Sequence, residues 1–349
     1  MNWMIYGAYG YTGELIAKEA KRRGLSPILA GRSRDRTEAL ARSLGLEARV
    51  FDLGTPAAMA VHLKNVQLVL NCAGPFSATS GPMMEACLAA PAHYLDITGE
   101  IAVFEQAQSL DARARAAGVI LCPGVGFDVI PTDCVAAALK KALPDATHLA
   151  LGFDSRSGFS PGTAKTSVEG LALGGRVRRE GRIVPVPLAF HTRRIDFGDG
   201  EKLAMTIPWG DVSTAYHSTG IPNIEVYIPC SPRLVKNARR ANHVRPLLKL
   251  RFIQELIKRH IGRTVKGPDE ATRDRQPTYV WGEARNAAGK TVTARIRTAN
   301  GYSLTVTGAL AVVEHLRSHA PAGGAYTPSR LVGADLVSRL PGSGPLEIC

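Results

Sequence analysis

Residues 3–13 read Trp3-Met4-Ile5-Tyr6-Gly7-Ala8-Tyr9-Gly10-Tyr11-Thr12-Gly13, and this stretch decides the fold. A short apolar run leads into three glycines at intervals of three, and an amphipathic helix pattern follows at once. Glycines let the backbone approach a ligand closely, and the N–H groups and dipole of a helix N-terminus attract an anion. The stretch therefore predicts a strand, a turn and a helix that bind a pyrophosphate. Its Gly-x-x-Gly-x-x-Gly spacing is a variant of the commoner Gly-x-Gly-x-x-Gly motif.

Five further strands are expected after this turn, and helical patterns alternate with them. The strand-like runs cover residues 27–30, 48–51, 67–71, 93–96 and 119–122. Strands that alternate regularly with helices favour a parallel sheet with right-handed crossovers. The sequence therefore predicts an α/β protein whose N-terminal part is a Rossmann-type, doubly wound parallel sheet.

The pattern changes after Asp133. Strand-like segments follow at 148–154, 183–196, 203–207, 223–229, 279–283 and 291–298. The last two flank Ala287-Ala288-Gly289, as the strands of a β-hairpin would. These segments predict a second α/β (α+β) domain with a mixed or antiparallel sheet. A helix over 302–317 follows, and the Pro-, Gly- and Ser-rich tail from Pro321 is expected to run over the surface, with one helix at 328–340.

Composition bounds the class of protein. A chain of 349 residues is long enough for two domains, and 45% apolar residues are typical of a globular chain. The N-terminus lacks the basic region, apolar stretch and cleavage site of an export signal, so we expect a cytoplasmic protein. The six cysteines form no Cys-x-x-Cys pair, which favours reduced thiols over disulfides or a zinc site. No histidine spacing is typical of a metal site, and none is expected.

The residues after the second predicted strand indicate the cofactor. An NAD site usually places an acid about 20 residues past the glycines, where it binds the ribose 2′-hydroxyl. Arg32 occupies this place, Ser33 and Arg34 follow, and the first acid is Asp35. Cations and a hydroxyl suit a 2′-phosphate, so we expect NADP. The alternative is an ordinary solvated start of a helix.

Other cofactor contacts are expected at the ends of the third and fourth strands. Asp52 would lie near the adenine, and Asn71 with the small-residue turn after it would face the nicotinamide side of the crevice. The alternative for this turn is a plain connection between a strand and a loop. The expected cofactor-binding residues are Gly7, Tyr9, Gly10, Tyr11, Thr12, Gly13, Arg32, Ser33, Asp52, Asn71, Ala73, Gly74 and Pro75.

Four motifs carry a resemblance to a known family. They are Gly-x-x-Gly-Tyr-Thr-Gly at 7–13, Asn-Cys-Ala-Gly-Pro-Phe at 71–76, His-Tyr-Leu-Asp-Ile-Thr-Gly-Glu at 93–100 and Pro-Gly-Val-Gly-Phe-Asp-Val-Ile-Pro-Thr-Asp at 123–133. The chain resembles the saccharopine dehydrogenase-like oxidoreductases, and within them the trans-acting enoyl reductases. The likeness continues through Gly267-Pro268 with Arg273 and Gly301-Tyr302 with Thr305.

The resemblance implies a domain organisation and an activity. It implies a Rossmann domain over 1–130, a substrate or dimerisation domain with an open sheet over 131–301, and a segment of about 302–345 that packs back onto the first domain. It also implies hydride transfer linked to NADP. Its motifs do not name a substrate.

Four residues are candidates for catalysis, each with a structural alternative. Tyr94 lies on the fifth predicted strand, where a role in the core is favoured over catalysis. Asp128 follows two glycines at the expected domain junction, where it would orient the substrate or anchor the hinge. Lys165 lies in a glycine- and hydroxyl-rich loop, as a ligand of a phosphate or carbonyl oxygen, or as a solvated lysine. Glu100 heads a helix, where capping competes with catalysis.

A basic segment suggests a partner. Between Arg233 and Arg275 there are thirteen Lys and Arg and four Asp and Glu, and the whole chain carries a net charge of +13. Residues 239–263 read as one or two amphipathic helices, interrupted at Pro246. They would form a lid for an acyl chain, dock an acidic carrier protein, or contact an anionic membrane as a peripheral protein. The alternative is a solvated cationic face. No nucleic-acid-binding pattern accompanies the charge.

The leading hypothesis is an NADP-dependent oxidoreductase that reduces a small-molecule or acyl-linked substrate, an enoyl thioester by resemblance. One alternative is an imine (C–N) reductase of the saccharopine dehydrogenase type. The other is a non-catalytic NADP-binding regulatory protein. A homodimer is the common default for such a chain.

Overall fold

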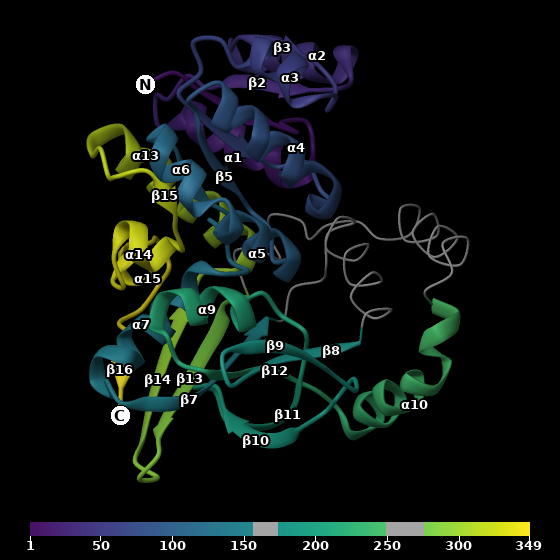
Figure 1. Ribbon diagram of the computed structural model, residues 1–349, viewed down its shortest axis with the longest axis vertical. Helices are drawn as coiled ribbons and strands as arrows, with labels where there is room; N and C mark the ends of the chain where they lie inside the picture. Colours follow the sequence, from purple (N-terminus) through teal and green to yellow (C-terminus); the bar gives the residue numbers. More distant parts are fainter. Residues whose placement is uncertain (156–173, 249–275) are drawn as a thin grey trace. The chain divides into compact units, whose positions relative to one another are not determined.

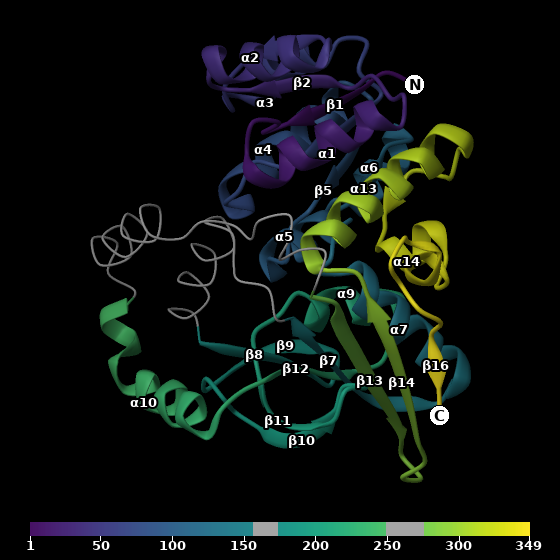
Figure 2. The same cartoon turned by 180° about the vertical axis from the view of Figure 1, so that it is seen from behind.

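The chain forms two compact units in the computed structural model, which describes residues 1–155, 174–248 and 276–349. Unit 1 consists of Met1–Ile130 and Tyr302–Gly333, and unit 2 of Pro131–Gly301 and Ala334–Cys349 (Figures 1 and 2). The terminal residues from Ala334 therefore group with unit 2, whereas the sequence analysis assigned residues to about 345 to the first domain.

Unit 1 is built on a seven-stranded sheet in which every neighbouring pair of strands is parallel. Its order is β3-β2-β1-β4-β5-β6-β15. The direction of strand order reverses between β1 and β4, which is the switch point of a doubly wound sheet. This confirms the predicted Rossmann-type fold. The strands are β1 (Trp3–Tyr6), β2 (Ile28–Gly31), β3 (Ala48–Val50), β4 (Leu68–Asn71), β5 (His93–Asp96), β6 (Ile120–Cys122) and β15 (Gly324–Ala325).

Helices connect these strands, and local sequence explains where several of them begin and end. The Thr55 hydroxyl accepts a bond from the Ala58 N–H at the start of α3, and Pro56 is its first residue. Helices α2 and α6 end at Gly45 and Gly118, both in the left-handed conformation that favours glycine. The helices are α1 (Tyr11–Arg22), α2 (Arg34–Leu44), α3 (Pro56–His62), α4 (Phe76–Ala89), α5 (Ile101–Ser109), α6 (Asp111–Ala117), α13 (Gly301–Ser318) and α14 (Pro328–Val332).

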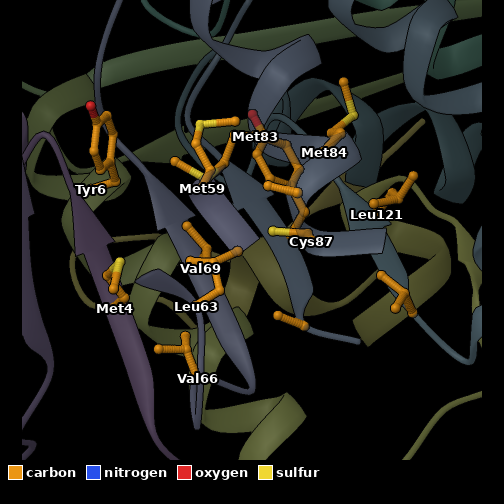
Figure 3. Close-up of a cluster of buried hydrophobic side chains, with 14 of the residues drawn as sticks. Met4, Tyr6, Met59, Leu63, Val66, Val69, Met83, Met84, Cys87 and Leu121 are labelled. Atoms are coloured by element: carbon orange, nitrogen blue, oxygen red, sulfur yellow. The ribbon is translucent and has the colours of Figure 1, made fainter. Parts of the chain in front are cut away.

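Both faces of this sheet are buried. On one face, strand residues such as Met4 and Val69 pack with Met59 of α3 and Met83 and Met84 of α4 (Figure 3). The residues that alternate with them along the strands, including Ile5, Leu29, Leu70 and Leu95, are also fully buried. Side chains of successive strand residues point to opposite faces, so helices or loops cover the second face as well.

The tail of the chain differs from its prediction. Gly324–Ala325 pairs with Ile120–Leu121 of β6 and adds a seventh strand to the sheet. The region at 328–340, expected to hold one helix, holds two short ones, α14 and α15 (Leu336–Arg339). A two-residue strand has no periodicity of its own, so its pairing depends on long-range contacts that the sequence does not show.

Unit 2 contains a mixed sheet, as predicted. Its main path is β10-β11-β12-β7-β13-β14-β16, in which β12 and β7 are parallel and the other neighbours antiparallel. The strands are β7 (Ala146–Ser155), β8 (Gly175–Arg179), β9 (Arg182–Val186), β10 (Thr192–Asp196), β11 (Glu201–Thr206), β12 (Asn223–Pro229), β13 (Thr278–Asn286), β14 (Thr291–Thr298) and β16 (Glu347–Ile348). Strands β13 and β14 form the predicted hairpin.

Helix α7 (Ile130–Ala142) covers one face of the second sheet, and a separate hydrophobic cluster lies among the strands. A Cβ atom on Gly282 of β13 would lie 2.5 Å from Val135 and 2.8 Å from Leu139, both on α7. The other cluster contains the buried side chains of Ile195, Phe197, Ala204, Tyr227 and Trp281. The remaining helices of this unit are α7 (Ile130–Ala142), α9 (Asp211–Thr219), α10 (Pro232–Leu248) and α15.

Helix α10 also differs from its prediction. It begins at Pro232 and passes through Pro246 to Leu248 without the predicted interruption, and residues 249–263 of the basic segment lie outside the described residues. Among the described residues, no helix is both long and apolar enough to span a bilayer.

Candidate functional site

The glycine-rich turn joins β1 to α1 at the carboxyl edge of the first sheet. The N–H groups of Gly7 and Ala8 both donate to the Ala30 carbonyl, at 2.8 and 3.1 Å, which ties the turn to β2. The Glu14 N–H donates to the Gly10 carbonyl at 2.8 Å and closes the first turn of α1. Within the described residues no side chain caps this helix, and the dipole at its N-terminus favours an anion.

Two of the glycines are required by close contacts. Gly7 has a φ of +78°, and a Cβ on it would lie 2.8 Å from the Ala73 nitrogen, in the turn after β4. A Cβ on Gly13 would lie 2.4 Å from the Gly7 carbonyl oxygen. The turn after β1, the start of α1 and the turn after β4 therefore meet without side chains between them. This is the cradle that a pyrophosphate needs.

The end of β2 carries the residues predicted to select the 2′-phosphate. Arg32 is exposed, and Ser33 is the N-cap residue of α2 with no bond from its side chain to the helix. Arg34 pairs with Glu38 at 2.8 Å. The Arg32 guanidinium makes no ion pair within the described parts of the chain.

Arg36 is a residue that the sequence analysis missed. Its guanidinium lies 4.5 Å from the centre of the Tyr9 ring, and its Nη2 donates to the Tyr9 carbonyl at 3.1 Å. The Ser33 N–H donates to the Tyr9 hydroxyl at 3.4 Å, so Tyr9 links the glycine turn to the start of α2. The signal was a third arginine shortly after Arg32, in the first turn of the helix that follows. The predicted adenine neighbour Asp52 is exposed just beyond β3.

Asn71, at the end of β4, fixes the turn that follows. Its Oδ1 accepts the Ala73 N–H at 3.0 Å, and its Nδ2 donates to Thr79 Oγ1 and to the Tyr94 hydroxyl, both at 3.3 Å. Thr79 Oγ1 donates to the Ala73 carbonyl at 2.6 Å. Gly74 and Pro75, joined by a cis peptide, are exposed next to this anchored residue. The fully buried Asn71 thus holds Ala73 against Gly7.

A buried network continues from Asn71 to the ends of β5 and β6. The Tyr94 hydroxyl donates to Asp96 Oδ2 at 2.7 Å, and Asp96 Oδ1 accepts the N–H groups of Thr98 and Gly124 at 3.0 and 2.9 Å. Tyr94 and Asp96 are fully buried. Burial raises the pKa of Asp96 to about 6 and also raises that of Tyr94. The structure therefore places Tyr94, a predicted catalytic residue, as a link between Asn71 and Asp96.

Glu100 caps a helix, but not the one that it heads. Its two carboxylate oxygens accept the N–H groups of Phe76 and Ser77 at 2.9 and 2.7 Å, at the start of α4. It lies just before α5 in sequence. Capping satisfies N–H groups that have no partner within the helix.

Asp128 lies beyond β6, next to the loop that carries Glu100. A Cβ on Gly99 would lie 2.9 Å from Asp128 Oδ2, so the carboxyl group packs against that loop. Burial raises the pKa of Asp128 to about 7, and the negative charge of Glu100 adds to the rise. The neighbouring Phe127 N–H donates to Thr305 Oγ1 at 3.0 Å, which fixes the segment to α13. Asp128 can therefore hold or release a proton near neutral pH.

Lys165 lies outside the described residues. No group of three or more His, Cys, Asp or Glu in the described residues is arranged to bind a metal ion. None of the six cysteines, all of which are described, forms a disulfide.

The residues that the structure brings together fit a dinucleotide. The cradle formed by Gly7, Gly13 and Ala73 suits the pyrophosphate, and the cations around the start of α2 suit a 2′-phosphate. Asn71 and Asp128 lie at the carboxyl ends of β4 and β6, on the nicotinamide side of a doubly wound sheet.

Comparison with known proteins supports this assignment. Residues 3–122 match the saccharopine dehydrogenase NADP-binding domain family. A trans-acting enoyl reductase of Mycobacterium bovis (strain BCG / Pasteur 1173P2) is 28% identical over 206 residues, 55% of this chain and 49% of the relative. A human saccharopine dehydrogenase-like oxidoreductase is 29% identical over 150 residues, 37% of this chain and 35% of the relative. The matches thus span less than half the length of these relatives.

A solved structure shares the fold over nearly the whole chain. It is the apo saccharopine dehydrogenase (L-Glu forming) of Saccharomyces cerevisiae, with a TM-score of 0.60 and 10% identity over 97% of this chain and 96% of that one. These comparisons confirm the predicted resemblance: residues 3–122 match the saccharopine dehydrogenase NADP-binding domain, and the chain is similar to a saccharopine dehydrogenase-like oxidoreductase and a trans-acting enoyl reductase.

Proposed function

We propose that this protein is an NADP-dependent oxidoreductase that reduces a small-molecule or acyl-linked substrate. The observation that carries the proposal is the glycine cradle, where Gly7 and Gly13 have no room for a Cβ against Ala73 and the Gly7 carbonyl. The match to an NADP-binding domain covers this cradle and the ends of β1 to β6.

Named residues would hold the cofactor. The N–H groups at the start of α1 would bind the pyrophosphate, and Arg32, Ser33 and Arg36 would bind the 2′-phosphate. Asn71 holds the turn at Ala73, Gly74 and Pro75, which would contact the nicotinamide side of the cofactor. When bound, NADPH supplies the hydride. The protein then orients the acceptor and handles the proton that reduction requires.

We propose Asp128 as the proton donor. Hydride addition to a polarised double bond leaves negative charge on the acceptor, and a nearby carboxylic acid neutralises it. The pKa of about 7 keeps a large share of Asp128 protonated at neutral pH, because burial and the Glu100 charge disfavour the carboxylate. Tyr94 and Asp96, which are fully buried, act as positioning residues for the ends of β4, β5 and β6.

For the substrate, we favour an enoyl thioester. One relative named a trans-acting enoyl reductase matches 55% of this chain, which is more of the chain than the family match over residues 3–122. Reduction of the enoyl double bond adds a hydride to one carbon and a proton to the other. NADPH would provide the hydride, and Asp128 would provide the proton.

The test follows NADPH oxidation with purified protein against enoyl thioesters, cyclic imines and oxo acids. Turnover with enoyl thioesters alone supports the proposed substrate, whereas turnover with imines would assign the protein to C–N reduction. Tight NADPH binding without turnover on the whole panel would contradict the enzymatic proposal and favour an NADP-binding regulatory protein.

A further inference from the structure

Helix α10 of unit 2 carries a stripe of cations that the proposed function does not use. Residues 232–248 contain five Lys or Arg and no Asp or Glu. Figures 1 and 2 both show α10 at the margin of the second sheet. It carries the largest concentration of positive charge on any helix of the described residues.

The inner face of α10 is fixed by specific contacts. Val235 is buried with Ala189 and Met205, and Ala238 packs against the same cluster. Asn242 accepts the Leu188 N–H at 2.8 Å and donates to the Leu188 carbonyl at 3.2 Å. Since positions 235, 238 and 242 share one helical face, the rotation of the helix about its axis is set.

The opposite face is cationic. Arg233, Lys236 and Arg240 follow the i, i+3, i+7 spacing of one face, and all three are exposed. Leu234, on the flank between this face and the buried one, is 45% exposed and is one of four large hydrophobic side chains exposed in the described residues. A helix that presents cations with an apolar side chain to solvent has the pattern of a membrane-surface helix.

Several cations on helices of unit 1 are paired with carboxylates of the chain. Lys18 pairs with Glu14, Arg113 with Glu85 and Arg115 with Asp111, at 2.6 to 2.7 Å. By contrast, no carboxylate of the described residues pairs with Arg233, Lys236 or Arg240. Their charge is left for an outside anion.

We propose that the surface formed by Arg233, Leu234, Lys236 and Arg240 docks the protein on an anionic lipid bilayer. A stable protein partner needs a large complementary patch with aromatic or apolar anchors. Among residues 232–243 of α10, whose side chains are described, Leu234 is the one large apolar side chain that is exposed. A bilayer needs no matching pocket, and its phosphates provide charge for a line of cations about 10 Å long.

The test measures binding of the full chain to vesicles by co-sedimentation. We expect binding to vesicles that contain phosphatidylserine or phosphatidylglycerol, little binding to pure phosphatidylcholine, and release as salt shortens the Debye length. The triple variant Arg233→Gln, Lys236→Gln, Arg240→Gln should bind on the order of 100-fold more weakly, since each cation near an anionic leaflet contributes roughly a factor of five.

A matched control removes the same charge elsewhere. The variant Lys18→Gln, Arg113→Gln, Arg115→Gln loses three cations that are 56 to 62% exposed and already paired. It should keep its affinity for anionic vesicles, and both variants should keep NADPH affinity, which reports that unit 1 is intact.

Three results would overturn the proposal. They are equal losses in the two triple variants, equal binding to neutral and anionic vesicles, and no vesicle binding by the unaltered chain. If an acidic acyl-carrier protein binds in place of vesicles and the α10 variant abolishes that binding, the surface docks a protein. None of these outcomes depends on whether the protein reduces a substrate.

Discussion

Single residues decide the proposed cofactor preference, and Arg32 is the sharpest case. We expect Arg32→Asp to weaken NADPH binding by roughly 10- to 100-fold, because it removes a charge-assisted contact and sets a carboxylate against the 2′-phosphate. NADH binding should change little or improve. Titration of both cofactors by fluorescence measures the two affinities.

The control for this change lies on the same helix. Arg42→Asp makes the same change of charge at the other end of α2, where the side chain is 73% exposed, and should leave the ratio of the two affinities unchanged. If NADH binds the unaltered protein more tightly than NADPH, our interpretation of Arg32 is wrong.

Asp128 is the residue on which the proposed proton transfer depends. Because the protonated form donates, we expect kcat to fall as pH rises through about 7, the pKa of this group. Asp128→Asn should lower kcat by roughly 10²- to 10⁴-fold and remove this limb of the pH profile. Asp335→Asn, a surface change, should do neither. A variant that retains both the rate and the pH limb would exclude Asp128 as the donor.

The same pKa shift has a consequence for stability. The pKa of Asp128 is raised from 3.8 to about 7 in the folded protein, so the folded state binds more protons than the unfolded state between these values. The free energy of unfolding therefore falls as pH rises across that window. Asp128→Asn should reduce this fall, which denaturant unfolding on either side of the window measures. An unchanged pH dependence would contradict the raised pKa.

At the scale of elements, the start of α1 depends on contacts that exclude side chains. We expect Gly13→Ala to destabilise unit 1 by about 1–3 kcal/mol and to weaken NADPH binding, because its Cβ would lie 2.4 Å from the Gly7 carbonyl oxygen. Gly54→Ala, where a Cβ would meet open space, is the matched control. Urea unfolding and cofactor titration provide the two readouts. Equal effects in both variants would exclude close packing as the cause.

The elements that the sequence predicted well are those with local signals. Strands β1 to β6 have apolar runs between helices, and the β13–β14 hairpin has a Gly-containing turn. Strand β15 has two residues and is defined by pairing with β6, more than 200 positions earlier in the chain. The interruption predicted at Pro246 is wrong, since α10 continues through this proline and ends at Leu248.

Site residues, like the elements, were predictable where their signal is local and not where long-range contacts set their role. The glycine cradle was predictable because glycine spacing is local. Glu100 was expected to cap the helix that it heads, but it caps α4, whose start is 24 residues earlier. Tyr94 was expected either in the core or as a catalytic residue. It is fully buried together with Asp96, because a parallel sheet covered on two faces leaves neither side of β5 open.

For the whole molecule, unit 1 contains every residue for which we predict a cofactor contact, from Gly7 to Pro75. NADPH should therefore slow hydrogen exchange in β1, α1 and the turn after β4. At a concentration 100 times its dissociation constant, it should stabilise the state that binds it by about 2.7 kcal/mol. The amides of the β13–β14 hairpin in unit 2 should exchange at the same rate with and without NADPH. Mass spectrometry of exchanged peptides separates the two regions, and NADH at equal concentration serves as the control.

Protection of the hairpin equal to that of the glycine turn would mean that unit 2 also binds the cofactor. Equal protection by NADH and NADPH would remove the role assigned to the 2′-phosphate and, with it, the part that we give to Arg32 and Arg36.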